Sequence, residues 1–368
     1  MQKKQVAVLD IGSSKITAVV GERGVNKTFI IKGRRSFEYD GFAEGIFFDV
    51  NGLKKVVSSA VEFIKKSMRQ SISVLYVGVP GEFTTVTVKD AQIAFSKKKK
   101  ITEVDVDALF DSAFVASTAG VLINRSAIRY ELDDYRRLAN PLGFTSEILK
   151  GKLTFIVCQN YFIDTFKGIF SECGVNQVEY VSSALAEAMY LIEAETRDRI
   201  AMLLDVGYIT STFSLIQGDG ILYQSAFSYG GGYITASISE KYSLDFDVAE
   251  ELKRKVNLCK VAQSEYESIA TESGDYYSAD GLIKVVRNSL DLLCEKVSNA
   301  IEESGYVIPE YVPLFITGGG IAYLRGAKGQ IANRLGVQVE VIAPKVPLMD
   351  NPTESSLLSL IDLSLENN

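Results

Sequence analysis

Short apolar runs alternate along this chain with segments in which apolar residues recur every three or four positions. Residues 73–80 and 152–158 are nearly continuous apolar runs of strand length. Residues 53–64 place apolar side chains on one face of a helix, and residues 282–301 repeat this spacing until the chain reaches Gly305. Strands that alternate with amphipathic helices are typical of a layered α/β fold.

Similar spacing predicts three further helices, over residues 183–194, 247–258 and 354–365. Residues 83–90 and 91–96 are expected to form two paired strands.

Thr102 and Asp105 have the spacing of a capping box, which predicts a helix that extends to about Ala119. Lys97–Lys100 is expected to be a solvated loop before that helix, because runs of like charge are usually exposed. The alternative is contact with an anionic lipid or an acidic partner.

Two segments of the chain resemble each other. Residues 7–21 read AVLDIGSSKITAVVG and residues 202–218 read MLLDVGYITSTFSLIQG, so each is a strand, a polar turn and a second strand. The matched positions are Asp10 with Asp205 and Gly12 with Gly207, at an offset of 205 − 10 = 195 residues. Two such halves predict a duplicated α/β fold with a cleft between its lobes.

Composition limits the chemistry. The chain has 368 residues, of which 47% are hydrophobic, and this is compatible with two or more domains. Its net charge of −7 argues against nucleic acid as a partner, and the absence of histidine excludes Ser-His-Asp catalysis and imidazole metal sites. No signal peptide or membrane-spanning run is visible, so a cytoplasmic location is expected. The scattered cysteines are expected to be reduced; they are Cys158, Cys173, Cys259 and Cys294.

The first Asp-x-Gly turn has the parts of a phosphate-binding loop. Gly12 permits a tight turn, Ser13 and Ser14 supply donors, and Lys15 supplies positive charge. Asp10 could hold Mg²⁺ through water, because Mg²⁺ keeps several waters and few carboxylates. Taken alone, the motif is better explained as an ordinary hairpin turn with Asp and Gly in their usual turn positions.

The other candidate segments are also weak when taken singly. Gly207 and Thr210 belong to the second turn, which would face the first across the cleft. Two glycine runs permit close backbone approach, and the candidate residues in them are Gly231, Gly232, Gly318, Gly319 and Gly320. Glu250 and Lys253 lie i, i+3 on one helix, where the usual alternative is a solvated ion pair. The order and spacing of these segments make them support one another.

Taken together, these segments resemble the FtsA family of bacterial cell-division proteins, within the actin superfamily. VAVLDIGSSKITAVVGE resembles its first phosphate segment, FSYGGGYITASI and VAEELKRKV resemble two later ones, and PLFITGGGIAYLRG resembles the adenosine segment. The stretch Ala139-Asn140-Pro141-Leu142-Gly143 resembles part of the small subdomain inserted in that family, and general actin-like proteins lack it. The resemblance covers nearly the whole chain.

The resemblance implies an actin-like α/β fold, with two lobes around a nucleotide cleft and an inserted α+β subdomain. It divides the chain into a first lobe (1–75), the inserted subdomain (76–158), a second lobe (159–239), its smaller subdomain (240–305) and a closing segment (306–368). It implies ATP and Mg²⁺ as ligands, with Asp10 and Asp205 at the metal and Glu250 and Lys253 near the ribose and base.

Four departures from the family pattern alter the expected activity. Tyr208 and Ile209 replace glycines of the second phosphate loop, Thr212 stands in place of an aspartate, and Ser237 replaces another. Residues 183–186 lack the usual Glu-Pro. Bulky side chains would crowd a γ-phosphate, so slow or absent ATP hydrolysis is expected.

The C-terminal helix differs as well. Its charged residues, Glu354, Asp362 and Glu366, are all acidic, whereas a helix on a membrane surface is expected to carry basic residues. A docked domain helix is therefore expected, with membrane contact either through a partner or through a missing segment.

Function follows from the resemblance as an expectation. The chain would be an ATP-binding cytoskeletal adaptor that self-associates and links FtsZ to other divisome proteins at the inner face of the membrane. The C-terminal peptide of FtsZ would bind residues 240–305. A PilM-like adaptor of a type IV pilus or secretion assembly is the alternative, and a sugar kinase of the same superfamily fits less well because no catalytic base is evident.

Overall fold

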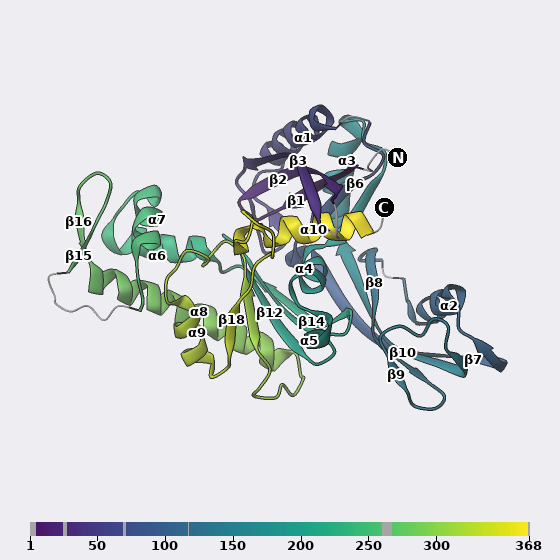
Figure 1. Ribbon diagram of the computed structural model, residues 1–368. Helices are drawn as coiled ribbons and strands as arrows, with labels where there is room; N and C mark the ends of the chain where they lie inside the picture. The colour runs from purple at the N-terminus through teal and green to yellow at the C-terminus, as the bar shows by residue number, and fades with distance from the viewer. Residues whose placement is uncertain (1–4, 25–27, 69–70, 117, 260–266, 367–368) are drawn as a thin grey trace.

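The computed structural model describes residues 5–24, 28–68, 71–116, 118–259 and 267–366. Its centre is formed by two five-stranded sheets, one in each lobe, that share the same topology. In each sheet an antiparallel three-stranded meander is extended by two parallel strands. Figure 1 shows the first lobe above the second, with the inserted subdomain to one side.

The first sheet has the order β11-β6-β1-β2-β3. Its strands are β1 (Gln5–Ile11), β2 (Lys15–Arg23), β3 (Phe29–Glu38), β6 (Leu75–Val79) and β11 (Val178–Ser182). Helices α1 (Val50–Ser67) and α3 (Asn160–Glu172) pack on one face, and α4 (Ser183–Leu191) and α10 (Ser355–Glu366) pack on the other (Figure 1). Both faces are apolar because both are covered.

The second sheet has the order β14-β13-β12-β17-β18. Its strands are β12 (Ala201–Val206), β13 (Ser211–Gln217), β14 (Gly220–Phe227), β17 (Leu314–Thr317) and β18 (Val339–Val341). Helices α8 (Ala279–Glu303) and α9 (Ala327–Leu335) belong to the same hydrophobic core as this sheet. The short helix α5 (Ala194–Arg197) leads into β12.

The two sheets repeat each other residue by residue at their inner ends. Asp10 pairs with Thr17 across the first hairpin, and Asp205 pairs with Thr212 across the second. Each residue of the second pair lies 195 positions after its counterpart in the first pair. The predicted duplication is therefore confirmed.

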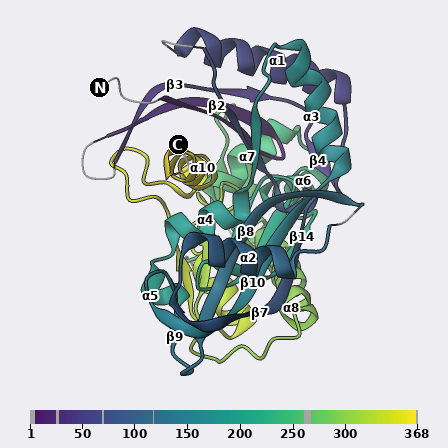
Figure 2. The same ribbon diagram turned by 90° about the vertical axis from the view of Figure 1, so that its right-hand side faces the viewer.

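The inserted subdomain is a four-stranded sheet, β7-β10-β8-β9, with helix α2 on one face (Figure 2). Its elements are β7 (Thr84–Lys100), β8 (Gly120–Leu132), β9 (Arg137–Leu138), β10 (Thr145–Gln159) and α2 (Glu103–Ala113). The prediction of two paired strands over 83–90 and 91–96 was wrong, because both segments belong to one continuous strand that pairs with β10, with a break in register between Ala94 and Lys99.

The lysine run also differs from its prediction. Lys97–Lys100 ends β7 rather than forming a loop, and Lys100 pairs with Thr145. Lys99 Nζ lies 2.8 Å from Asp105 Oδ1, and Lys97, Lys98 and Lys100 are exposed, as the prediction of a solvated segment requires.

The capping box at the start of α2 is confirmed, although the helix ends at Ala113 rather than near Ala119. Asp105 accepts hydrogen bonds from the backbone N–H of Thr102 at 2.9 Å and from its hydroxyl at 2.8 Å. We expect Thr102→Ala to lower the free energy of unfolding by about 1 kcal/mol. Urea unfolding would measure this, with Thr118→Ala outside the helix as the control.

A smaller subdomain extends the second lobe. It contains α6 (Gly231–Tyr242), α7 (Phe246–Lys255) and the hairpin of β15 (Ser268–Ala270) and β16 (Tyr276–Ser278). The first lobe adds a small hairpin, β4 (Phe42–Ala43) with β5 (Ile46–Phe47), and the short helices η1 (Gly81–Phe83) and η2 (Pro352–Glu354) flank the cleft. Within the described ranges, no helix is both long and apolar enough to cross a bilayer.

Segment boundaries differ from those expected. Strand β6 lies in the first sheet although it falls at the border of residues 1–75 and 76–158. Helix α3 packs on the first sheet and β11 completes it, so residues 160–182 belong with the first lobe rather than the second. Chain order misleads here because the inserted subdomain interrupts the first lobe.

Candidate functional site

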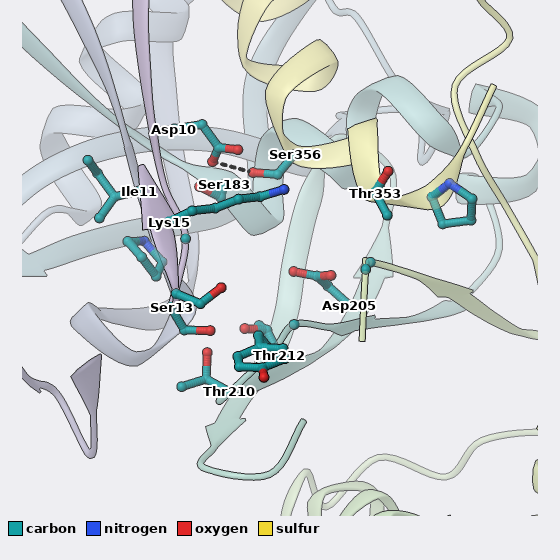
Figure 3. Close-up of a pocket in the computed structure, with 18 of the residues that line it drawn as sticks. Asp10, Ile11, Ser13, Lys15, Ser183, Asp205, Thr210, Thr212, Thr353 and Ser356 are labelled. Atoms are coloured by element: carbon teal, nitrogen blue, oxygen red, sulfur yellow. Dashed lines mark hydrogen bonds between the residues drawn. The ribbon is translucent and has the colours of Figure 1, made fainter. Parts of the chain in front are cut away.

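A cleft of about 750 Å³ lies between the two lobes (Figure 3). Most of the predicted site residues line it: Asp10, Gly12, Ser13, Ser14, Lys15, Asp205, Gly207, Thr210, Glu250, Lys253, Gly318 and Gly319. Gly231, Gly232 and Gly320 do not line it and lie behind the turns that do. The structure therefore brings segments from four distant parts of the chain to one cavity.

The first turn, between β1 and β2, offers free donors to the cleft. The N–H of Gly12 closes the turn by donating to the carbonyl of Lys15 at 3.0 Å, and the Tyr39 hydroxyl donates to the carbonyl of Gly12 at 2.7 Å. Within the described residues, the backbone N–H groups of Ser13 and Ser14 have no acceptor. Lys15 extends into the cavity near Asp10 (Figure 3). These are the groups that an anion would contact.

The second turn, between β12 and β13, closes in the same way and touches the first. The N–H of Gly207 donates to the carbonyl of Thr210 at 2.9 Å. The N–H of Ile209 donates to Ser13 Oγ at 3.0 Å, and this hydrogen bond joins the two lobes directly.

The glycine runs allow turns to pack backbone against backbone. Gly320 donates to the carbonyl of Val206 at 2.7 Å, and Gly231 donates to the carbonyl of Gly207 at 2.9 Å. A side chain at Gly231 would lie 2.3 Å from the carbonyl oxygen of Gly320. The three glycines that do not line the cleft thus support its shape, and their N–H groups are not free for a ligand.

Three carboxyl groups face the cleft, and Glu187 is buried while Asp10 and Asp205 are half-buried. Burial and the neighbouring Asp10 raise the pKa of Asp205 to about 7. Burial raises the pKa of Asp10, although the hydrogen bond from Ser356 and the charge of Lys15 oppose the change. Burial, Asp205 and Asp10 together raise the pKa of Glu187 well above its usual value. Carboxylates that raise one another's pKa form a site for positive charge.

Glu187 and Ser356 are site residues that the sequence interpretation missed. Glu187 lies on α4, is 2% exposed, and within the described residues its Oε1 has no hydrogen-bond partner. One signal could have found it, namely a lone acidic residue in the apolar stretch of residues 184–188. Ser356 donates to Asp10 Oδ1 at 2.7 Å (Figure 3). Ser356 and Asp10 lie 346 residues apart in the sequence, so no local pattern indicates this contact.

Glu250 and Lys253 form a buried pair rather than a solvated one. Lys253 Nζ lies 2.7 Å from Glu250 Oε2 and donates to the carbonyl of Gly231 and the hydroxyl of Thr235, both at 2.9 Å. Burial alone would raise the pKa of Glu250. The hydrogen bonds from Lys253 and Thr235 outweigh this effect, so the pKa of Glu250 is lowered. The ring of Tyr208 lies 5.9 Å from Lys253 Nζ. The pair therefore ties α7 to α6 at the edge of the cleft.

The carboxyl groups fit a hydrated cation better than a directly bound one. Within the described residues, no group of three acidic or cysteine side chains is arranged to hold a metal ion. Mg²⁺ usually keeps several waters and takes only one or two carboxylates together with phosphate oxygens. Asp10 and Asp205, with the unpartnered Glu187 beside them, suit that mode of binding.

Two lobes with duplicated sheets, each of which supplies an Asp-x-Gly turn to the cleft between them, define an actin-like protein. Residues 173–359, about half of the chain, match the family described as Type IV pilus assembly protein PilM. The chain belongs to this family.

Curated relatives confirm the resemblance to FtsA. The cell division protein FtsA of Pseudomonas aeruginosa is 22% identical over 334 residues, which cover 88% of this chain and 79% of that protein. FtsA of Streptococcus pneumoniae is 22% identical over 371 residues, which cover 97% of this chain and 79% of that protein.

Solved structures confirm the actin-like fold. A chain of a PilM–PilN type IV pilus biogenesis complex matches with a TM-score of 0.65 at 17% identity, over 99% of both chains. EutJ of Carboxydothermus hydrogenoformans gives 0.56 at 12% identity, over 99% of this chain and 90% of that one. MreB5 of Spiroplasma citri bound to ADP gives 0.55 at 13% identity, over 99% of both chains.

Proposed function

We propose that this protein is an actin-like adaptor that binds ATP with Mg²⁺ between its lobes. The observation that carries this proposal is the pair of equivalent turns facing one cavity, with free N–H groups, Lys15 and three carboxyl groups. Asp10 and Asp205 would hold Mg²⁺ through water, and Ser13, Ser14 and Lys15 would contact the phosphates. Mg²⁺ would supply the charge that offsets these carboxylates.

We expect ATP hydrolysis to be slow or absent. Tyr208 lines the cleft where the family pattern has a glycine, and its side chain takes up room that a γ-phosphate would need. Thr212, which lines the cleft, cannot serve as the carboxylate that it replaces. Turnover at the rate of ordinary kinases would contradict this part of the proposal.

Asp10→Ala is expected to weaken the binding of Mg-ATP at least about tenfold, because it removes a carboxylate from the cation. Calorimetric titration of the full chain would measure the affinity. Asp164→Ala, on the exposed side of α3, is the matched control and should bind as wild type does. Equal affinity of Asp10→Ala and wild type would contradict the assignment of the cleft.

Adaptor function requires a protein partner, and two classes are proposed. The likeness to FtsA supports an FtsZ C-terminal peptide bound to residues 240–305, together with self-association and other divisome contacts. Membership of the PilM family supports the tail of a PilN-like pilus protein instead. Other divisome proteins or the PilN-like protein would bring the protein to the inner face of the membrane.

Binding of both peptides to the full chain, measured by fluorescence anisotropy, would decide between them. Tight binding of the FtsZ peptide alone supports a divisome role, and tight binding of the PilN-like tail alone supports a pilus role. Sedimentation with and without ATP tests self-association. If neither peptide binds, the adaptor proposal fails, whatever the result for nucleotide.

A further inference from the structure

Helix η2 and the first turn of α10, which follow each other directly, form a wall of the cleft that no sequence motif indicated. Thr353, Glu354 and Ser356 line the cavity (Figure 3). The first turn of α10 touches both lobes, because Ser356 contacts Asp10 of β1 and Ser355 accepts a hydrogen bond of 2.6 Å from the hydroxyl of Thr317 in β17. Thr317 is the sheet neighbour of Asp205. One helical turn is therefore connected to both Asp-x-Gly strands.

Ser356 behaves differently from other serines of the same helix. Ser359 and Ser364 each donate to the carbonyl four residues earlier, at 2.7 and 2.6 Å, as serines in helices commonly do. Ser356 instead donates out of the helix to Asp10 Oδ1 at 2.7 Å. This is the length of a strong hydrogen bond to a charged acceptor.

The contact fixes one oxygen of the carboxylate and leaves the other for a ligand. Within the described residues, Ser356 is the hydrogen-bond donor to Asp10, and it occupies Oδ1. The positive end of the helix dipole lies at the same turn and favours the ionised carboxylate. Oδ2 is then presented in a set direction, as bound cations and their waters require.

We propose that Ser356 is a positioning residue, which orients the Asp10 carboxylate toward a hydrated divalent cation bound with the nucleotide. This inference rests on the proposed binding of Mg-nucleotide. It predicts an effect on the part of the affinity that depends on Mg²⁺, and not on the contacts that the nucleotide makes elsewhere in the cleft.

The test compares the affinity of the full chain for ADP in Mg²⁺ and in EDTA, by calorimetry. In wild type, Mg²⁺ should raise the affinity for ADP by some factor. In Ser356→Ala this factor should be at least about fivefold smaller, because a hydrogen bond to a charged group is removed. Its affinity in EDTA should stay within about twofold of wild type. Ser356→Thr keeps the hydroxyl and should restore the gain.

Ser359→Ala is the matched control, because it removes a buried serine from the same helix without touching Asp10. It should keep both affinities. If Ser356→Ala does not fold, Ser356→Cys, with a similar volume and a weaker donor, carries the same prediction. If Ser356→Ala or Ser356→Cys keeps the full Mg²⁺ gain, or loses affinity equally in EDTA, the positioning role alone is overturned. A wild-type protein that binds no nucleotide overturns the proposed function.

Discussion

Gly318→Ala is expected to lower the free energy of unfolding by about 3–5 kcal/mol. Gly318 has a φ of +92°, which side chains rarely adopt. Its Cβ would lie 2.1 Å from Asp205 Oδ1 and 2.4 Å from the carbonyl oxygen of Val206. Strain and overlap act together, and the backbone of Val206 cannot move without opening the sheet that holds Asp205. Urea unfolding followed by circular dichroism would measure the loss.

Gly329→Ala is the matched control for this prediction. Gly329 lies within α9, its φ is not positive, and an added Cβ would meet nothing within 4 Å. Alanine should therefore raise the free energy of unfolding by about 0.5–1 kcal/mol, as expected for a glycine inside a helix. If both variants changed stability in the same direction, the tight packing around Gly318 would be disproved.

The glycines show how far the sequence could define the site. Gly318 and Gly320 belong to one run, and a local pattern gives them one role. In the structure Gly318 lines the cleft, whereas Gly320 packs on the carbonyl of Gly207. The sequence predicts where the backbone must be tight, but only the arrangement of the turns shows whether a ligand or another turn approaches.

The duplication could be predicted because two short segments of the chain have similar sequences. Asp10 and Asp205 each end a buried strand before a glycine, and this pattern requires no knowledge of distant contacts. Glu187 and Ser356 were not predictable in this way, because each acquires its role from segments far away in the chain. The loop predicted at Lys97–Lys100 was wrong for a related reason, since the end of β7 pairs with β10 while Lys97, Lys98 and Lys100 stay exposed.

Asp205→Asn is expected to stabilise the ligand-free protein and to weaken its binding of Mg-nucleotide. The pKa of Asp205 is raised to about 7, above its usual value of 3.8. A carboxyl group whose pKa is raised by folding costs stability where it is ionised. As the pH rises from about 4 to about 7, this cost grows, and above pH 7 it stays constant.

The asparagine variant should therefore match wild type in stability near pH 4 and exceed it by about 1–3 kcal/mol at pH 8, because asparagine carries no charge to bury. Urea unfolding at both pH values gives the difference, and Asp164→Asn should show none. Calorimetry at pH 8 should show that Mg-nucleotide binds more weakly to Asp205→Asn than to wild type. A residue kept for folding would lose stability when replaced, so a gain in stability coupled to a loss of binding would identify Asp205 as a residue kept for its ligand. A variant that is less stable than wild type at pH 8 would show that Asp205 serves the fold.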